Sequence, residues 1–416
     1  MDGLERFPSH YGQISSLYGR GFVSRGDAAY WSAPEIAPVD AIALCSSRLA
    51  APMYTHERVT LFKVAQIIAE FKGVKCAGRY DHAHPPLGNV YFVPDDSLML
   101  DEAFDRGIHS ENALYGGVVP YAFVKTKAVT HDIVSPTAIK PNGWLHVFAD
   151  TAREVVLPGY TVFSADDARI AGGRLLPRGP IRVKEPLGDG GYGQTVIRTA
   201  GDLDAFLENF SAQKLAGYGL VLETNLRSVV TRSVGHITLC GATIAYHGTQ
   251  RTVTNNAGRS VYGGSHLVCV RGGWDALEHL PMDAQTHLAV VQARSYDRAI
   301  NKYPGFFASR RNYDVGQGID GQGQWRSGVF EASWRSGGAS TAELAAFVAL
   351  ARDPTLQVVE ASAVKEFGRL RKAPLGAIVH FQGDDPQDGP ILRYTIVHEP
   401  IVGPRTINRT SAFARC

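Results

Sequence analysis

The hydrophobic pattern of residues 39–125 predicts a small parallel α/β domain. Val39–Cys45 is a short apolar run, which is typical of a buried strand. Apolar residues then recur at helical spacing from Leu61 to Phe71, and Gly73 is placed to end this helix. Further strands are predicted at Val74–Gly78 and Asn89–Val93. Strand, helix and strand at this spacing indicate a Rossmann-like layer.

The pattern after residue 126 mixes short helical and strand signals. A pair of strands, Ile181–Lys184 and Gln194–Ile197, is separated by a glycine-rich segment. Helices are predicted at Asp202–Phe210, Pro281–Ile300 and Thr341–Ala351, and strands at Leu220–Leu222, Thr238–Tyr246, Val329–Trp334, Leu356–Val359, Gly376–Phe381 and Ile391–Val397.

Composition and charge narrow the class of protein. The chain has 416 residues, 44% hydrophobic and 20% charged, which is globular composition with room for two or three domains. The net charge is only +2, from 42 Lys and Arg and 40 Asp and Glu. This small net charge argues against nucleic-acid binding, which needs a concentrated basic surface. The sequence has no apolar run of about 18 residues and no apolar stretch near its start, so we expect a cytoplasmic protein that does not bind membranes.

The glycine-rich segment 188–193 is the first candidate for chemistry. It lies between two strands, whereas the Rossmann and Walker loops both open a helix. Its backbone N–H groups can therefore lie over a triphosphate as a hairpin lid, and Lys184 would add a positive charge on the phosphates. The alternative is an ordinary turn.

A second candidate is the polar face of the predicted strand Val329–Trp334. Because side chains alternate along a strand, Glu331, Ser333 and Arg335 are predicted to share one face, with Phe330 on the other. Together with Asp314, the carboxylate could hold Mg²⁺, which binds few carboxylates plus substrate phosphates. The alternative is a structural Glu–Arg ion pair.

Taken in order, these features resemble the ATP-grasp superfamily over roughly residues 120–352, and also a bacterial family of ATP-grasp-like proteins without an assigned substrate. The resemblance implies a Rossmann-like domain followed by an ATP-grasp fold of two α+β subdomains. The expected divisions are an N-terminal extension (1–38), a Rossmann-like domain (39–125), a subdomain with the glycine lid (126–226), a subdomain with the metal site (227–352) and a strand-rich tail (353–416).

The resemblance also assigns nucleotide-binding roles. Lys184 matches the second phosphate lysine, and Lys127 looks like the first, with Lys125 and Lys140 as weaker candidates. The lid glycines are Gly190, Gly191 and Gly193, and the hinge at the adenine would use Glu223 and Leu226.

The remaining assignments concern the metal and the reacting groups. Asp314 and Glu331 match the metal ligands, and Ser333 is a third candidate ligand for Mg²⁺, because its hydroxyl stands where the superfamily usually has Asn. Arg335 matches the arginine that follows them. Arg251, between the hinge and the metal strand, could hold the triphosphate or an acyl phosphate, although a solvated turn is the alternative.

The function implied is that of an ATP- and Mg²⁺-dependent ligase. It would join a small-molecule carboxylate to an amine, or to a thiol, through an acyl phosphate. Two alternatives stay open: a phosphotransferase on the same fold, and a nucleotide-binding protein with little turnover, which Ser333 favours. A nicotinamide-dependent dehydrogenase is a weaker alternative. A homo-oligomer is also left open, as is the role of the tail.

Overall fold

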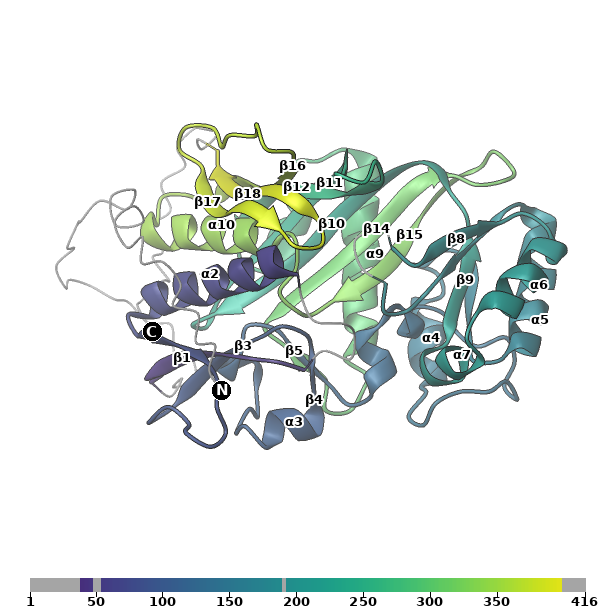
Figure 1. Ribbon diagram of the computed structural model, residues 1–416, viewed down its shortest axis with the longest axis horizontal. Coiled ribbons are helices and arrows are strands. Elements are labelled where there is room, and N and C mark those ends of the chain that lie inside the picture. The colour runs from purple at the N-terminus through teal and green to yellow at the C-terminus, as the bar shows by residue number, and fades with distance from the viewer. Residues whose placement is uncertain (1–37, 48–53, 189–191, 399–416) are drawn as a thin grey trace. The chain divides into compact units, whose positions relative to one another are not determined.

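The computed structural model of the chain describes residues 38–47, 54–188 and 192–398 (Figure 1). The expected N-terminal extension therefore lies almost wholly outside the described residues. None of the helices in the described ranges is both long and apolar enough to cross a membrane.

The N-terminal part of the described chain is the parallel α/β layer that the hydrophobic pattern predicts. Its strands are β1 (Ala41–Cys45), β2 (Lys75–Arg79) and β3 (Val90–Pro94), which pair in parallel in the order β2-β1-β3. Helix α2 (Thr55–Lys72) connects β1 to β2 and ends at Gly73, whose φ of 72° suits glycine. The predicted Rossmann-like layer is confirmed.

A small sheet follows this layer. Its order is β13-β5-β4, so a strand from late in the chain pairs with β5. The elements are β4 (Leu98–Met99), α3 (Leu100–Phe104), β5 (Gly117–Val119) and β13 (Phe307–Ala308).

A four-stranded sheet carries the predicted glycine hairpin, with strand order β6-β9-β7-β8. The hairpin strands β7 (Ile181–Lys184) and β8 (Gln194–Ile197) pair antiparallel, as predicted. The other elements of this part are α4 (His146–Ala152), β6 (Gly159–Val162), α5 (Ala165–Leu175), α6 (Ala200–Asn209), α7 (Ala212–Tyr218) and β9 (Leu220–Thr224). Leucine, isoleucine and valine side chains of these strands and helices form a common core.

An eight-stranded antiparallel sheet makes up most of the remaining chain, with strand order β15-β14-β10-β11-β12-β16-β18-β17 (Figure 1). Its strands are β10 (Arg227–Leu239), β11 (Ala242–Thr254), β12 (Ser260–Arg271), β14 (Arg310–Ile319), β15 (Trp325–Ser333), β16 (Val358–Phe367), β17 (Ile378–Asp385) and β18 (Gly389–Val397). Because β16 pairs with β12, the strands of the expected C-terminal tail complete this sheet. The α/β and α+β fold class is confirmed, and the lid-bearing and carboxylate-bearing sheets are the two α+β parts that the ATP-grasp resemblance implied.

One sequence prediction in this sheet is wrong. Thr238–Tyr246 was expected to be a single strand, but a tight turn divides it between β10 and β11. Cys240 and Gly241 have φ of 56° and 73°, the left-handed pair that a two-residue hairpin turn requires.

The two faces of the large sheet are covered by different helices. Helix α10 (Ser340–Arg352) packs on the face that bears Tyr246, whose hydroxyl donates to Glu343 of α10. Helices α8 (Trp274–Glu278) and α9 (Ala284–Ile300) cover the other face, where Tyr313 donates to Asp297. Since Tyr313 and Asp314 are consecutive on β14, the Asp314 carboxylate projects from the α10 face.

Candidate functional site

Lys184 ends β7 and is paired with a glutamate from the neighbouring strand. Lys184 lies opposite Val221 on β9, so Glu223, two residues further on, projects from the same face. The Lys184 Nζ atom is 2.5 Å from Glu223 Oε1, and Glu223 Oε2 is 3.1 Å from Nε2 of His131. All three side chains are almost completely buried, at 1–3% exposure.

Electrostatics keep this glutamate ionised. Burial by itself would raise the pKa of Glu223, but the positive charge of Lys184 and the hydrogen bond with His131 outweigh it and lower the pKa below its usual value. The hinge glutamate predicted from the sequence is therefore held by Lys184 and His131. His131 was not predicted, because only the fold brings it to β9.

The two predicted metal ligands face each other across neighbouring strands. Asp314 on β14 lies directly opposite Glu331 on β15. Oδ1 of Asp314 accepts hydrogen bonds from Ser233 at 3.2 Å and from the Asn312 amide at 2.9 Å. Burial and then the charge of Glu331 raise the pKa of Asp314 to about 6. A buried carboxylate whose pKa is raised by a neighbouring carboxylate marks a site that a cation would stabilise.

A β-bulge at Phe330 corrects one detail of the predicted strand. Asp314 pairs with Glu331, whereas the next residue, Val315, pairs with Val329, so Phe330 is the extra residue. Its ring fills the space above Gly316, where a Cβ atom would come within 1.8 Å of the ring. The ring thereby reaches the site, and its centroid lies 4.4 Å from Lys184 Nζ. Simple alternation had placed Phe330 on the opposite face.

Lys127 joins the carboxylates to the lid. It lies in a single helical turn, Lys127–Val129, and its Nζ is 2.8 Å from Oε2 of Glu331. The same ammonium group donates to the carbonyl oxygen of Gly188, at the start of the glycine segment. Of the three lysines proposed as the first phosphate lysine, Lys125 pairs with Asp96 and bonds Ser47 and Ser97, and Lys140 bonds Pro136, so Lys127 is the one that the fold brings to the site.

The lid is described only in part. Gly190 and Gly191 lie outside the described residues, whereas Gly193 has a φ of 67°, and its carbonyl accepts from the Glu185 amide at 2.8 Å. The neighbouring Tyr192 contacts the β11–β12 turn. Asn255 Nδ2 lies 3.3 Å from the Tyr192 hydroxyl, and the Arg259 guanidinium lies 4.8 Å from the ring centroid.

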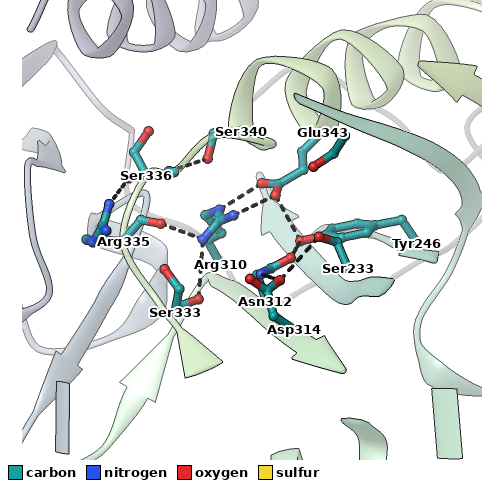
Figure 2. A network of polar contacts seen from close by, with 12 residues as sticks. Ser233, Tyr246, Arg310, Asn312, Asp314, Ser333, Arg335, Ser336, Ser340 and Glu343 are labelled. Carbon is teal, nitrogen blue, oxygen red and sulfur yellow. Dashed lines mark hydrogen bonds and ion pairs between the residues drawn. The ribbon is translucent and has the colours of Figure 1, made fainter. Parts of the chain in front are cut away.

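A buried ion pair fixes the segment that carries Ser333 and Arg335. Figure 2 shows the Arg310 guanidinium between the Glu343 carboxylate, at 2.7 and 2.8 Å, and the carbonyl oxygens of Ser333 and Arg335, at 3.3 and 2.5 Å. Tyr246 extends this network, because its hydroxyl contacts both Glu343 at 2.8 Å and Asn312 at 3.1 Å.

The alternation of polar residues on β14 is a sequence pattern that could have predicted this network. Arg310, Asn312 and Asp314 alternate on β14 and so share one face, and Glu343 stands in the first turn of α10. The side chain of Arg335 itself donates to the Ser336 carbonyl oxygen at 3.2 Å.

Leu226 lies where the prediction expected it, whereas Arg251 does not reach the carboxylate pair. Leu226 is buried directly after β9, at the entry to β10, as a hinge residue would be. Arg251 is half-exposed and contacts the Gly263 carbonyl oxygen at 3.0 Å and Glu366 at 3.5 Å. Its neighbour Gln250 is the residue that reaches the Asp314 network, through a 2.9 Å hydrogen bond to Ser233. A catalytic role of Arg251 stays a prediction.

The donor set limits which metal ion the site could hold. In the described part of the chain, His, Cys, Asp and Glu side chains form no cluster of three or more that could ligate a metal. The Asp314–Glu331 pair instead fits Mg²⁺, which commonly takes one or two carboxylates and completes its shell with phosphate oxygens and water.

Comparison with solved structures finds several chains that resemble this one along most of its length. N5-carboxyaminoimidazole synthetase from Staphylococcus aureus, complexed with ADP, is 12% identical, with a TM-score of 0.45 over 87% of this chain and 94% of that one. Phosphoribosylamine–glycine ligase from Thermotoga maritima is 12% identical, with a TM-score of 0.47 over 85% and 91%. Biotin carboxylase from Campylobacter jejuni is 11% identical, with a TM-score of 0.47 over 87% and 88%.

Comparisons of the sequence itself give one assignment. No curated protein matches. The model of a family described as "Protein of unknown function (DUF3182)" matches residues 45–395, which is most of the chain. The chain therefore belongs to the DUF3182 family.

Proposed function

We propose that this protein binds ATP with Mg²⁺ and uses it to join a carboxylate to an amine. The observation that carries the proposal is the position of Lys127, which contacts both the glycine segment through Gly188 and the carboxylate pair through Glu331. A cation between a glycine lid and two carboxylates is the arrangement that a triphosphate with its metal ion requires.

Different residues would bind the phosphates, the metal ion and the adenine. Lys127 and Lys184 supply positive charge to the phosphates, and the ring of Phe330 lies against Lys184. Asp314 and Glu331 would hold Mg²⁺, whose charge offsets that of the phosphate oxygens. Leu226 and the backbone that follows Glu223 would face the adenine.

The reaction then proceeds in two balanced steps. A carboxylate oxygen of the substrate attacks the γ-phosphorus, the bond to the β-phosphate oxygen breaks, and ADP leaves. The amine nitrogen next attacks the acyl carbon, the bond from this carbon to the phosphate oxygen breaks, inorganic phosphate leaves, and the nitrogen releases a proton to water. Arg335, two residues after the end of β15, would stabilise charge on the transferred phosphoryl group, and the lid would exclude water from the acyl phosphate.

Calorimetric titration with ATP and Mg²⁺ tests the nucleotide site. Lys184→Met should weaken ATP binding at least tenfold, but it also leaves Glu223 buried without its lysine. The double variant Lys184→Met/Glu223→Gln removes both charges, so it should regain thermal stability and still bind ATP poorly. Arg169→Met, which removes an exposed charge of α5, is the matched control. Wild-type ATP affinity in the double variant would refute the site.

The products test the reaction. The proposal requires that ADP and free phosphate be released only when both a carboxylate and an amine are present. A stable phosphorylated product would instead indicate a phosphotransferase, and ATP binding with no turnover for any acceptor would indicate a binding protein.

A further inference from the structure

A small pocket that contains two cationic side chains lies on the same face of the large sheet as Asp314. We call it the Lys365–Arg393 pocket. It is lined by Tyr262, Gly264, Gly338, Thr341, Ala363, Val364, Lys365, His380, Arg393 and Tyr394. Among these described lining residues two carry a positive charge and none is acidic.

The two cations are held next to each other by strand register. Lys365 on β16 lies directly opposite Arg393 on β18, so both side chains leave the same face of the sheet. Lys365 has one acidic partner, Asp388, at 3.3 Å. The Arg393 guanidinium makes no hydrogen bond or ion pair with another residue in the described ranges.

Neighbouring like charges are unfavourable unless something negative joins them. Burial lowers the pKa of both Lys365 and Arg393, and the charge of Arg393 lowers that of Lys365 further. Glu57 of α2 and Asp388 act on the pair in the opposite direction. An additional anion in the pocket would relieve the remaining excess of positive charge.

The wall of the pocket adds to this positive potential. Gly338 and Thr341, which line it, flank the N-terminus of the 13-residue helix α10. A helix N-terminus carries a partial positive charge and favours a bound anion. A Cβ at Gly338 would come within 2.4 Å of the Tyr262 ring, so glycine is needed for this close approach.

Polar contacts connect the pocket to the carboxylate pair. The β11–β12 register shifts at Gly263, which turns Tyr262 to the α10 face, where its hydroxyl lies 2.7 Å from Ser265 Oγ. Ser265 is opposite Gln250, which contacts Ser233, the hydrogen-bond donor to Asp314. The charges of Arg393 and of Asp314 both act on Tyr262, so this ring lies within electrostatic reach of both sites.

We propose that the Lys365–Arg393 pocket binds an oxyanion, a carboxylate or phosphate group, of the substrate that is joined, and so orients this substrate toward Asp314 and Glu331. This inference rests on the proposed function. The two cations select the charged end of the molecule, and the reacting end is left free to reach the nucleotide.

The test titrates the full-length protein with inorganic phosphate and, separately, with succinate, each in the presence of EDTA. We expect one of these probes to bind, and Arg393→Met and Lys365→Met each to weaken its binding at least tenfold. Arg393→Lys, which keeps the charge, should restore most of the affinity. Arg369→Met removes an exposed charge near the same strands and should change the affinity less than twofold.

The outcomes are distinguishable from those for the proposed function. Binding of phosphate assigns a phosphorylated substrate, and binding of succinate assigns a carboxylate. ATP affinity should stay within twofold in Arg393→Met, so equal losses for probe and ATP would make the pocket part of the nucleotide site and overturn the inference. It is also overturned if neither probe binds, or if the probe binds the wild type and both methionine variants alike.

Two other results, a variant that does not fold and a wild type that does not bind ATP, also have a defined interpretation. If Arg393→Met does not fold, as judged by thermal unfolding, Lys365→Met and Arg393→Lys decide the question. If ATP does not bind the wild type, the proposed function fails, whereas charge-dependent probe binding would still establish the anion pocket.

Discussion

The ammonium group of Lys127 lies 2.8 Å from the Glu331 carboxylate, so a side chain expected to bind phosphate is neutralised by a side chain expected to bind metal. This pairing has a consequence for ligand binding. A nucleotide with its metal ion must replace the Lys127–Glu331 contact by two others, one from lysine to phosphate and one from carboxylate to metal. Binding of the nucleotide and binding of the metal are therefore coupled.

We predict that Glu331→Gln uncouples them. Without the carboxylate, Lys127 is free for phosphate, so ADP should bind more tightly than in the wild type when EDTA is present. Mg²⁺ should no longer raise the affinity, and Mg²⁺-dependent turnover should fall by about two orders of magnitude. Calorimetry with and without Mg²⁺ measures the affinities. Glu360→Gln, at a half-exposed glutamate of β16, is the control, and an undiminished effect of Mg²⁺ in Glu331→Gln would contradict the metal assignment.

The buried pair of Arg310 and Glu343 is expected to dominate the stability of the site. Glu343→Ala would leave the guanidinium buried without its carboxylate, and we expect the free energy of unfolding to fall by about 3–5 kcal/mol. Urea denaturation measures this change. Glu278→Ala breaks a pair with Arg294 near the surface and should cost about 0–1 kcal/mol. Similar losses in the two variants would show that burial of the pair does not matter.

Tyr192 is expected to hold the lid down. Tyr192→Ala removes the contacts with Asn255 and Arg259, so bound nucleotide should dissociate about tenfold faster and more ATP should be hydrolysed without acceptor. Tyr192→Phe removes only the hydrogen bond, which is worth about 1 kcal/mol, and should have a smaller effect. Stopped-flow release of a fluorescent ATP analogue measures the dissociation rate. Identical rates in the wild type and both variants would show that the Tyr192 contacts do not retain the nucleotide.

Stability should fall on acidification because of buried neutral histidines. Burial on β10, where its ring packs against Trp274, lowers the pKa of His236 to about 4. Between about pH 6.5 and 4 the unfolded chain binds a proton that the folded chain does not, so folding becomes less favourable as the pH falls through this window. For His236 alone the loss by pH 4 is on the order of 3 kcal/mol.

The variant His236→Phe tests this prediction, because it keeps an aromatic ring and cannot titrate. The free energy of unfolding, measured by denaturation between pH 4 and 8, should depend less steeply on pH in the variant than in the wild type. Parallel curves would show that His236 does not contribute.

Local pattern was enough to predict those features that depend on nearby residues. The Rossmann-like layer, the hairpin of β7 and β8, and helices α9 and α10 follow from hydrophobic periodicity and glycine positions, which act within a few residues. Glu331 was identified because a charged residue on an apolar strand is costly unless it is used, and Lys184 because it ends the strand that precedes the glycine segment. Their order along the chain carried the resemblance.

The contacts between residues on different strands depend on the pairing register of strands that are far apart in the sequence. Lys184 meets His131 only because Glu223 lies between them on β9, and Phe330 reaches Lys184 only because one extra residue bulges β15. The Lys365–Arg393 pocket likewise requires β16 and β18 to continue the sheet that begins near β14. A shift of one residue in strand pairing sends a side chain to the other face, and the sequence of one strand does not specify its partner's register.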